Sequence, residues 1–267
     1  MDEVSDDAKE AAQRLSDHPW LEGLARGGYA ASGLIHIMIG WIAVRVALGS
    51  GGREADAAGA LQALRDAPLG VVLLWVCAVG FFALALWQLL EAVVGGPELT
   101  DRLKAAGKAA LYAALGVSTT TVAWGTQSDS GETTTDITTT LMGAPWGRAL
   151  VAVVGIAVVA AGLYHVHKGV TRTFLQEFER QATGTVGSVV RVAGILGYAA
   201  KGVALVVVGG LFLLAAWQSD PEEATGLDGA LKSLQGQPLG QALLITVAVG
   251  LALYGLFNIA RARYADM

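Results

Sequence analysis

Six long apolar segments constrain this chain more than any other feature, because each can cross a bilayer as an α-helix. Crossing a hydrocarbon core of roughly 30 Å takes about 20 helical residues. Only 15% of the residues are charged, whereas ordinary soluble domains carry about 25%. The sequence therefore predicts an all-α, polytopic membrane protein with six transmembrane helices. These helices are expected near residues 27–48, 69–94, 105–125, 146–168, 192–217 and 239–260.

The third of these segments is the least apolar, because Ser118 and the threonines at 119–121 lie inside it. Hydroxyl groups can hydrogen-bond to the carbonyl groups of their own helix, which lowers the cost of placing them in a membrane. The segment therefore still qualifies as a transmembrane helix.

Lysine and arginine residues gather in the loops on one side of the predicted membrane. With their immediate flanks, the two termini and the loops at 95–104 and 169–191 hold twelve of them, whereas the opposite loops hold four. Cytoplasmic loops carry the excess of positive charge in membrane proteins, so both termini are expected in the cytoplasm. Residues 1–23 are expected to form either a short helix on the membrane surface, anchored by residues such as Trp20 and Leu21, or a solvated tail.

The predicted outer loops are acidic instead. This charge either attracts cations to an outer vestibule or simply keeps the loops solvated. The formal net charge of −5 gives no electrostatic support for a nucleic-acid partner. The acidic residues are Glu54, Asp56, Asp66, Asp129, Glu132, Asp136, Asp220, Glu222, Glu223 and Asp228.

A Tyr-Ala-Ala motif recurs at the start of each odd-numbered span, as "GYAASG" at 28–33, "YAALG" at 112–116 and "GYAAKG" at 197–202. The glycine that ends each copy and a small residue seven positions later lie on one face of a helix. Small residues let backbones approach closely in a bilayer, and tyrosine suits the headgroup region. The motif predicts a helix-packing seam. Its residues are Tyr29, Gly33, Gly40, Tyr112, Gly116, Tyr198, Gly202 and Gly209.

A second repeated pattern, Pro-x-Gly, opens each even-numbered span, at 68–70, 145–147 and 238–240. Proline suits the first turn of a helix because its missing N–H would have no partner there. We therefore expect each proline to lie in the first helical turn.

Short outer helices are predicted just before two of these prolines, where "GALQAL" at 59–64 matches "GALKSL" at 229–234. The middle copy is rich in threonine, and residues 128–140 are expected to form a loose outer loop, with a lid over a ligand as the alternative. The repeats together predict three helical hairpins around a pseudo-threefold axis. After the tail at 1–23, the predicted hairpins cover residues 24–101, 102–175 and 176–267.

The stretches "HPWLEGLARGGYAASG" and "GALQALRDAPLGVVLLW" resemble the bacterial membrane family called domain of unknown function 1206. The resemblance covers roughly residues 18–262. It implies a two-helix unit repeated three times, from which the middle unit departs, and a location in the bacterial plasma membrane. It implies no activity and no functional residues.

An aromatic residue followed by a polar one recurs near the inner end of each even-numbered span. The polar members are Gln88, His165 and Asn258. If they face one axis, they line a pathway through the membrane. Alternatively, they form hydrogen bonds between neighbouring helices.

Three further polar residues lie inside predicted spans. His36 is a candidate haem ligand. The alternative is that it is a buried histidine whose ring is hydrogen-bonded to a neighbouring helix. Lys201 either extends its ammonium group to the inner interface or pairs with Glu91, which also lies near the inner side.

No nucleophile motif, metal-ligand spacing or cofactor signature stands in the sequence. We therefore predict a non-enzymatic scaffold or accessory subunit, with membrane lipids and another membrane protein as the candidate partners. One alternative is a small-solute channel or transporter with a pathway along the pseudo-threefold axis. A second is a membrane protein that binds haem or a lipid cofactor through His36.

Overall fold

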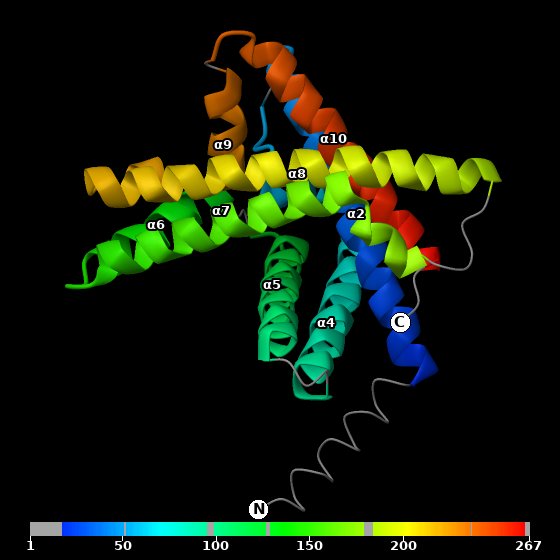
Figure 1. Ribbon diagram of the computed structural model, residues 1–267. Helices are drawn as coiled ribbons and strands as arrows, with labels where there is room; N and C mark the ends of the chain where they lie inside the picture. The colour runs from blue at the N-terminus through cyan, green and yellow to red at the C-terminus, as the bar shows by residue number, and fades with distance from the viewer. Residues whose placement is uncertain are drawn as a thin grey trace, which may run out of the picture. The chain divides into compact units, whose positions relative to one another are not determined.

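The computed structural model describes residues 18–50, 52–94, 99–126, 129–178, 184–235 and 237–264. All regular secondary structure in these ranges is helical (Figure 1). In chain order the helices are α2 (Pro19–Ala47), α3 (Ala57–Arg65), α4 (Gly70–Val94), α5 (Leu99–Trp124), α6 (Ser130–Met142), α7 (Gly147–Thr171), η1 (Thr173–Phe178), α8 (Gly184–Gln218), η2 (Pro221–Glu223), α9 (Gly226–Gln235) and α10 (Gly240–Tyr264).

Five helices among the described residues are long and apolar enough to cross a membrane, namely α2, α4, α7, α8 and α10. They indicate a helical, multi-pass membrane protein. Helix α5 has a similar length of 26 residues but is less apolar. Its hydroxyl groups bond within the helix as expected, since Thr119 and Thr120 donate to the carbonyls of Leu115 and Gly116 at 2.6 and 2.8 Å.

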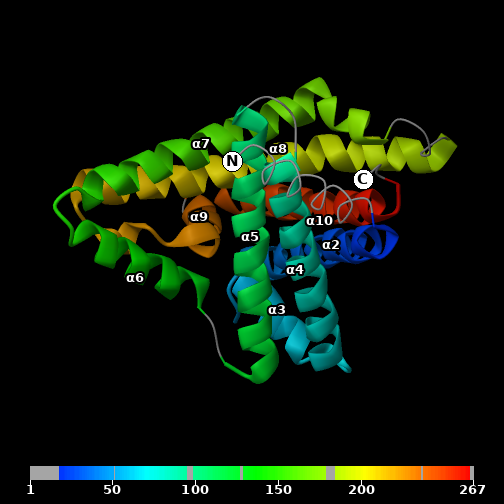
Figure 2. The same cartoon turned by 90° about the horizontal axis from the view of Figure 1, so that it is seen from below.

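The chain packs into two compact units. Unit 1 holds Met1–Ser32, Leu64–Thr126 and Asn258–Met267, and unit 2 holds Gly33–Ala63 and Gln127–Phe257. In unit 1, α4 and α5 lie side by side, and in unit 2 α7 and α8 do the same (Figure 1, Figure 2). Each pair joins the second long helix of one predicted hairpin to the first long helix of the next.

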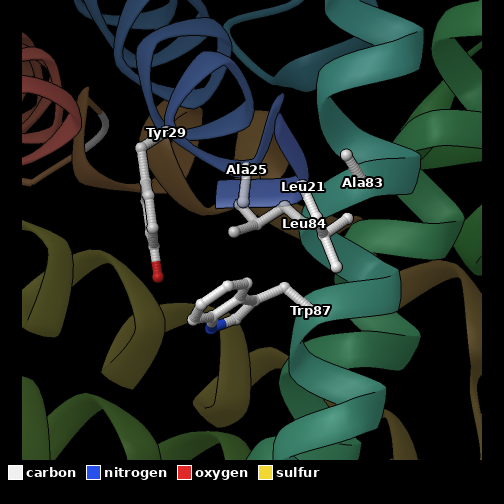
Figure 3. Close-up of a cluster of buried hydrophobic side chains, with 6 residues drawn as sticks. All are labelled: Leu21, Ala25, Tyr29, Ala83, Leu84 and Trp87. Atoms are coloured by element: carbon white, nitrogen blue, oxygen red, sulfur yellow. The ribbon is translucent and has the colours of Figure 1, made fainter. Parts of the chain in front are cut away.

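Helix α2 begins earlier than the predicted span, at Pro19 rather than near residue 27. Leu21 is only 4% exposed and packs in a cluster between α2 and α4, whereas Trp20 is 64% exposed. Leu21 therefore packs inside unit 1, in first turns that are continuous with the rest of α2, and the position of these turns at the membrane surface stays a prediction. Residues 1–17 lie outside the described ranges. Figure 3 shows this cluster, which consists of Leu21, Ala25, Tyr29, Ala83, Leu84 and Trp87.

The short helices predicted before two of the prolines are confirmed as α3 and α9. The loop predicted for 128–140 is wrong, because residues 130–140 lie in α6 and Asp129 caps it, while residue 128 lies outside the described ranges. Asp129 caps this helix by accepting a hydrogen bond from the Glu132 N–H at 2.7 Å. Threonine hydroxyls then bond to carbonyls one turn back, as Thr138 does to Thr134 at 2.8 Å. Polarity was a poor guide here because these hydroxyls find partners within the helix.

The prolines of the Pro-x-Gly pattern also lie outside the helices, which corrects the expectation of a first-turn position. Each glycine is the first residue of its helix. Its N–H donates to the carbonyl oxygen of the residue before the proline, which forms a tight turn. A Cβ atom on Gly147 would overlap the carbonyl of Leu141 at the end of α6, so only glycine fits. The three turn bonds run from Gly70, Gly147 and Gly240 to Ala67, Ala144 and Gln237, at 2.8, 2.9 and 2.7 Å.

Candidate functional site

Glycines of α7 and α8 bring these two helices into backbone contact within unit 2. A Cβ atom on Gly202 would lie 2.6 Å from the carbonyl oxygen of Gly162. One on Gly209 would lie 2.8 Å from the carbonyl oxygen of Gly155. Distances this short leave no room for a side chain, so α7 and α8 pack through their backbones at two points seven residues apart.

Helices α2 and α10 meet in unit 2 through equivalent residues. A Cβ atom on Gly40 would lie 2.5 Å from the carbonyl oxygen of Ala248, and Gly255 is in contact with the backbone of Gly33. Aligned on the repeated tyrosines and prolines, these pairs correspond to Gly209 with Gly155 and Gly202 with Gly162. Two seams of the molecule therefore share one register.

The α4·α5 seam in unit 1 is filled differently. Gly116 of α5 faces the ring of Phe82, whose nearest atom would lie 2.8 Å from an added Cβ. Ala78 of α4 and Ala123 of α5 take the positions of the outer glycine pair, and both are buried. Alanine in place of glycine keeps the surface of each helix thin.

The even-numbered spans carry small residues every seven positions, a signal that the sequence analysis missed. A period of seven keeps one helix face against its neighbour over several turns. The tyrosine motif marks the odd-numbered helix of each seam, and the heptad pattern marks the even-numbered helix. The two patterns together would have predicted both helices of each seam. These residues are Ala78, Ala85 and Ala92, then Gly155, Gly162 and Gly169, then Ala248, Gly255 and Ala262.

The repeated tyrosines bind cations near the inner ends of the helices. The Arg261 guanidinium lies 4.4 Å from the centre of the Tyr29 ring, and Lys168 Nζ lies 5.0 Å from that of Tyr198. Such contacts are attractive because the ring face is negative. The third tyrosine, Tyr112, stacks on Phe81 at 6.5 Å instead.

The three candidate pathway residues differ in their surroundings. Gln88 and Asn258 are 6% and 2% exposed and belong to unit 1. Asn258 Nδ2 is buried and has no hydrogen-bond partner within the described ranges. His165 belongs to unit 2, where its Nδ1 lies 2.7 Å from the Ala161 carbonyl of its own helix. That all three face one axis stays a prediction.

The structure brings two other candidates, His36 and Lys201, to one residue that sequence reasoning missed. Lys201 donates from Nζ to the Tyr254 hydroxyl at 3.2 Å and lies 4.2 Å from the centre of that ring. The centre of the His36 ring lies 4.9 Å from the centre of the Tyr254 ring, in an edge-to-face arrangement. Tyr254 has no counterpart in the other repeats, so no sequence signal marked it. Glu91 is exposed in unit 1.

Four of the ten acidic residues meet at the N-terminal ends of α3, α6 and α9 in unit 2; we call Glu54, Asp56, Asp129 and Asp228 the outer acidic cluster. Asp228 accepts the Ala55 N–H at 2.8 Å and pairs with Lys232 at 2.5 Å. Glu54 hydrogen-bonds to Asp129. Short contacts between caps thus join the three short helices.

Burial and the neighbouring carboxylates raise the pKa of Glu54 from 4.5 to about 8. The pKa of Asp129 is lowered, first by the Glu132 N–H and then by Glu54. Glu54 therefore carries the proton of this hydrogen bond at neutral pH and donates it to the Asp129 carboxylate. The acids serve as caps and hydrogen-bond partners as well as loop charges.

An open groove of about 410 Å³ runs between α2 and α4 in unit 1. A Cβ atom on Gly23 or Gly27 would meet no described atom within 4 Å. The two glycines stand four residues apart, the spacing at which transmembrane helices pack closely. The sequence analysis missed this pair because it used only the positive charge and the tyrosine of "GLARGGY" and did not consider the spacing of its glycines. The lining residues are Gly23, Leu24, Gly27, Val72, Trp75, Val76, Val79 and Gly80.

Comparison with known proteins identifies one matching family model and a similar bacterial protein. The family model described as Domain of Unknown Function (DUF1206) matches three successive segments, residues 27–95, 103–172 and 196–265. Uncharacterized protein YxxB of Bacillus subtilis (strain 168) is 29% identical over 257 residues, covering 93% of each chain. No solved structure matches. Since the three matches span most of its length, the chain belongs to the DUF1206 family.

Proposed function

We propose that this protein is a non-enzymatic membrane scaffold or accessory subunit, and that its partner is a transmembrane helix of another membrane protein. The open groove between α2 and α4 carries the proposal. Its walls are apolar, and Gly23 and Gly27 form a thin strip of helix surface that no described residue covers. A partner helix with small residues of its own can approach such a strip to backbone distance.

The proposal includes six spans arranged as three hairpins around a pseudo-threefold axis, with both termini in the cytoplasm of a bacterium. The distribution of positive charge supports this orientation. Each of the three family matches holds one odd-numbered and one even-numbered long helix. Helix α5 is proposed as the sixth span, because it packs along α4 and the hydroxyl groups of Thr119, Thr120 and Thr121 are bonded within the helix.

Reporter fusions test the number of spans. Alkaline phosphatase is active only outside the cytoplasm, whereas green fluorescent protein fluoresces inside it. With six spans, fluorescent protein fused after Met267 fluoresces and phosphatase fused there is inactive. With five spans and a cytoplasmic N-terminus, which a fluorescent protein fused before Met1 reads separately, the C-terminus lies outside the cytoplasm and its two signals exchange, which would contradict the proposal.

Purification from native membranes in mild detergent tests the scaffold role. We expect a membrane protein to co-purify at stoichiometric level, and Gly27→Leu to remove it by filling the groove. Gly107→Leu is the matched control, because Gly107 on α5 also has open space around it but lies outside the groove. Isolation of the wild-type chain alone, or equal loss of the partner in both variants, would contradict the scaffold role.

A small-solute channel or transporter is the second candidate. The buried amides of Gln88 and Asn258 favour it, since polar groups in membrane spans often line pathways. Asn258→Leu should then abolish solute flux into proteoliposomes that contain the purified protein. Unchanged flux, or an axis sealed on both sides in every state, would remove this candidate.

A further inference from the structure

We propose that the outer end of the α7·α8 seam binds an anionic phospholipid, with Arg148 as the ligand of the lipid phosphate and Trp146 and Trp217 as the walls. This inference rests on the membrane location proposed above but is independent of the scaffold role. Its elements all lie in unit 2.

A groove of about 550 Å³ marks this place, and we call it the tryptophan groove. Trp146 and Trp217 flank it and are 82% and 84% exposed. Tryptophan side chains concentrate at the headgroup level of membranes, where one part of the ring is wet and the rest apolar. The lining residues are Pro145, Trp146, Arg148, Ala149, Ala152, Leu213, Ala216 and Trp217.

Arg148 supplies a fixed positive charge in the groove. Its Nε and Nη2 donate to the carbonyl oxygen of Ala216 at 3.2 and 3.1 Å, which holds the guanidinium plane in place. That carbonyl lies in the last turn of α8, where helix carbonyls lack partners in the helix. The other guanidinium N–H groups have no partner among the described residues. Guanidinium groups with free donors recognise phosphate oxygens.

The beginning of α7 adds to this attraction. Arg148 is its second residue, so the positive end of the helix dipole also faces the groove. Deeper in the groove, Ala149, Ala152 and Leu213 offer an apolar surface to an acyl chain. A phosphate beside apolar chains is the chemistry of a phospholipid.

The equivalent end of the α2·α10 seam shows that this charge is unnecessary for packing. There Gln241 donates from Nε2 to the carbonyl of Ala47 at 3.1 Å, the same contact in the same register. Leu239 and Leu48 stand in place of the two tryptophans. The α7·α8 seam thus differs from its counterpart by one cation and two indoles, all of which face the groove.

The variant Arg148→Gln tests the proposal, because glutamine reproduces the contact that Gln241 makes. Native mass spectrometry of the purified full chain measures binding of dioleoylphosphatidylglycerol and, separately, of dioleoylphosphatidylcholine. We expect Arg148→Gln to weaken phosphatidylglycerol binding at least tenfold. It should weaken phosphatidylcholine binding much less, because the choline cation already neutralises the phosphate of that lipid. Trp217→Leu should weaken binding of both lipids less strongly. Thermal unfolding of each variant should match that of wild type.

Arg45→Gln is the control, because Arg45 is also an arginine at the outer end of a long helix but lies outside the tryptophan groove. It should retain wild-type binding. Equal binding of phosphatidylglycerol by wild type and Arg148→Gln would overturn the proposal. So would full displacement of the lipid by an equal concentration of inorganic phosphate, since the groove would then recognise a free anion. The reporter fusions and the co-purification test the proposed function by separate readouts.

Discussion

The α7·α8 and α2·α10 seams are alike in their middle and at their inner ends but differ at their outer ends. Both place small residues against the neighbouring backbone in one register, and both set a cation over a tyrosine. At the outer end one has Arg148 between two tryptophans, and the other has Gln241 between leucines. Close packing between the helices therefore constrains the residues that the two seams share. At the outer ends, where side chains face solvent and lipid, the residues can differ.

The largest effect is expected from filling a shared glycine position. Gly209→Leu puts a side chain where a Cβ alone would lie 2.7 Å from the Val159 backbone nitrogen, so we expect a loss of about 3 kcal/mol of stability. Gly40→Leu should cost a similar amount in the other seam. Thermal unfolding in detergent measures both.

Gly210→Leu is the control for this experiment, because the neighbouring glycine faces open space. It should unfold near the wild-type temperature. If Gly209→Leu and Gly210→Leu unfolded at the same temperature, close backbone packing at the seam would be refuted.

A smaller effect is expected at the inner ends. Arg261→Gln removes the cation over Tyr29 and should cost about 1 kcal/mol, and Lys168→Gln should cost a similar amount at Tyr198. The comparison of the seams predicts similar losses from the two variants. Tyr29→Phe keeps the ring and serves as the control. A loss in only one of the two seams would show that their inner ends differ.

Tyr254→Phe should have a smaller effect still. It removes the hydroxyl that accepts from Lys201 at 3.2 Å but keeps the ring under the ammonium group, so we expect a loss of about 0.5 kcal/mol. Chemical unfolding detects the change. A loss of several kcal/mol would assign this hydroxyl a role beyond the single hydrogen bond.

An effect of a different kind, on the pH dependence of stability, is expected from the outer acidic cluster. The folded chain keeps a proton on Glu54 up to about pH 8, whereas the unfolded chain releases it near 4.5. Stability from this group is therefore complete below pH 4.5 and falls as pH rises toward 8. Glu54→Gln should flatten this part of the unfolding profile. An identical profile in wild type and variant would contradict the assignment of the proton.

Much of the fold follows from the sequence because a bilayer imposes length and apolarity on each span. The six long helices in the described ranges each overlap a predicted span, and α3 and α9 lie where their leucine spacing placed them. The threonines of α6 misled the prediction, because composition does not show that hydroxyls such as those of Thr134 and Thr138 bond to a carbonyl one turn back.

The sites were harder to predict than the helices, because they depend on which residues of different helices meet. His36 and Lys201 were identified as polar residues inside spans. Nothing in the sequence indicated that both contact Tyr254, which only the structure shows. Similarly, the net charge of the outer loops did not show that Glu54 and Asp129 share a proton. The glycines of α7 could have been predicted from their spacing of seven residues. They were missed because the prediction of close packing used only the Tyr-Ala-Ala motif of the odd-numbered spans.

Disulfide cross-linking of the third seam tests the shared register most directly. The register of the other two seams places Ala78 opposite Ala123, and both are buried in unit 1. In a Cys77→Ala background, Ala78→Cys with Ala123→Cys should cross-link rapidly on oxidation, since a disulfide needs Cα atoms about 4.4–6.8 Å apart. Val79→Cys with Ala123→Cys should not, because Val79 is 50% exposed on another face of α4. Cross-linking of the Val79 pair in place of the Ala78 pair would contradict a register common to all three seams.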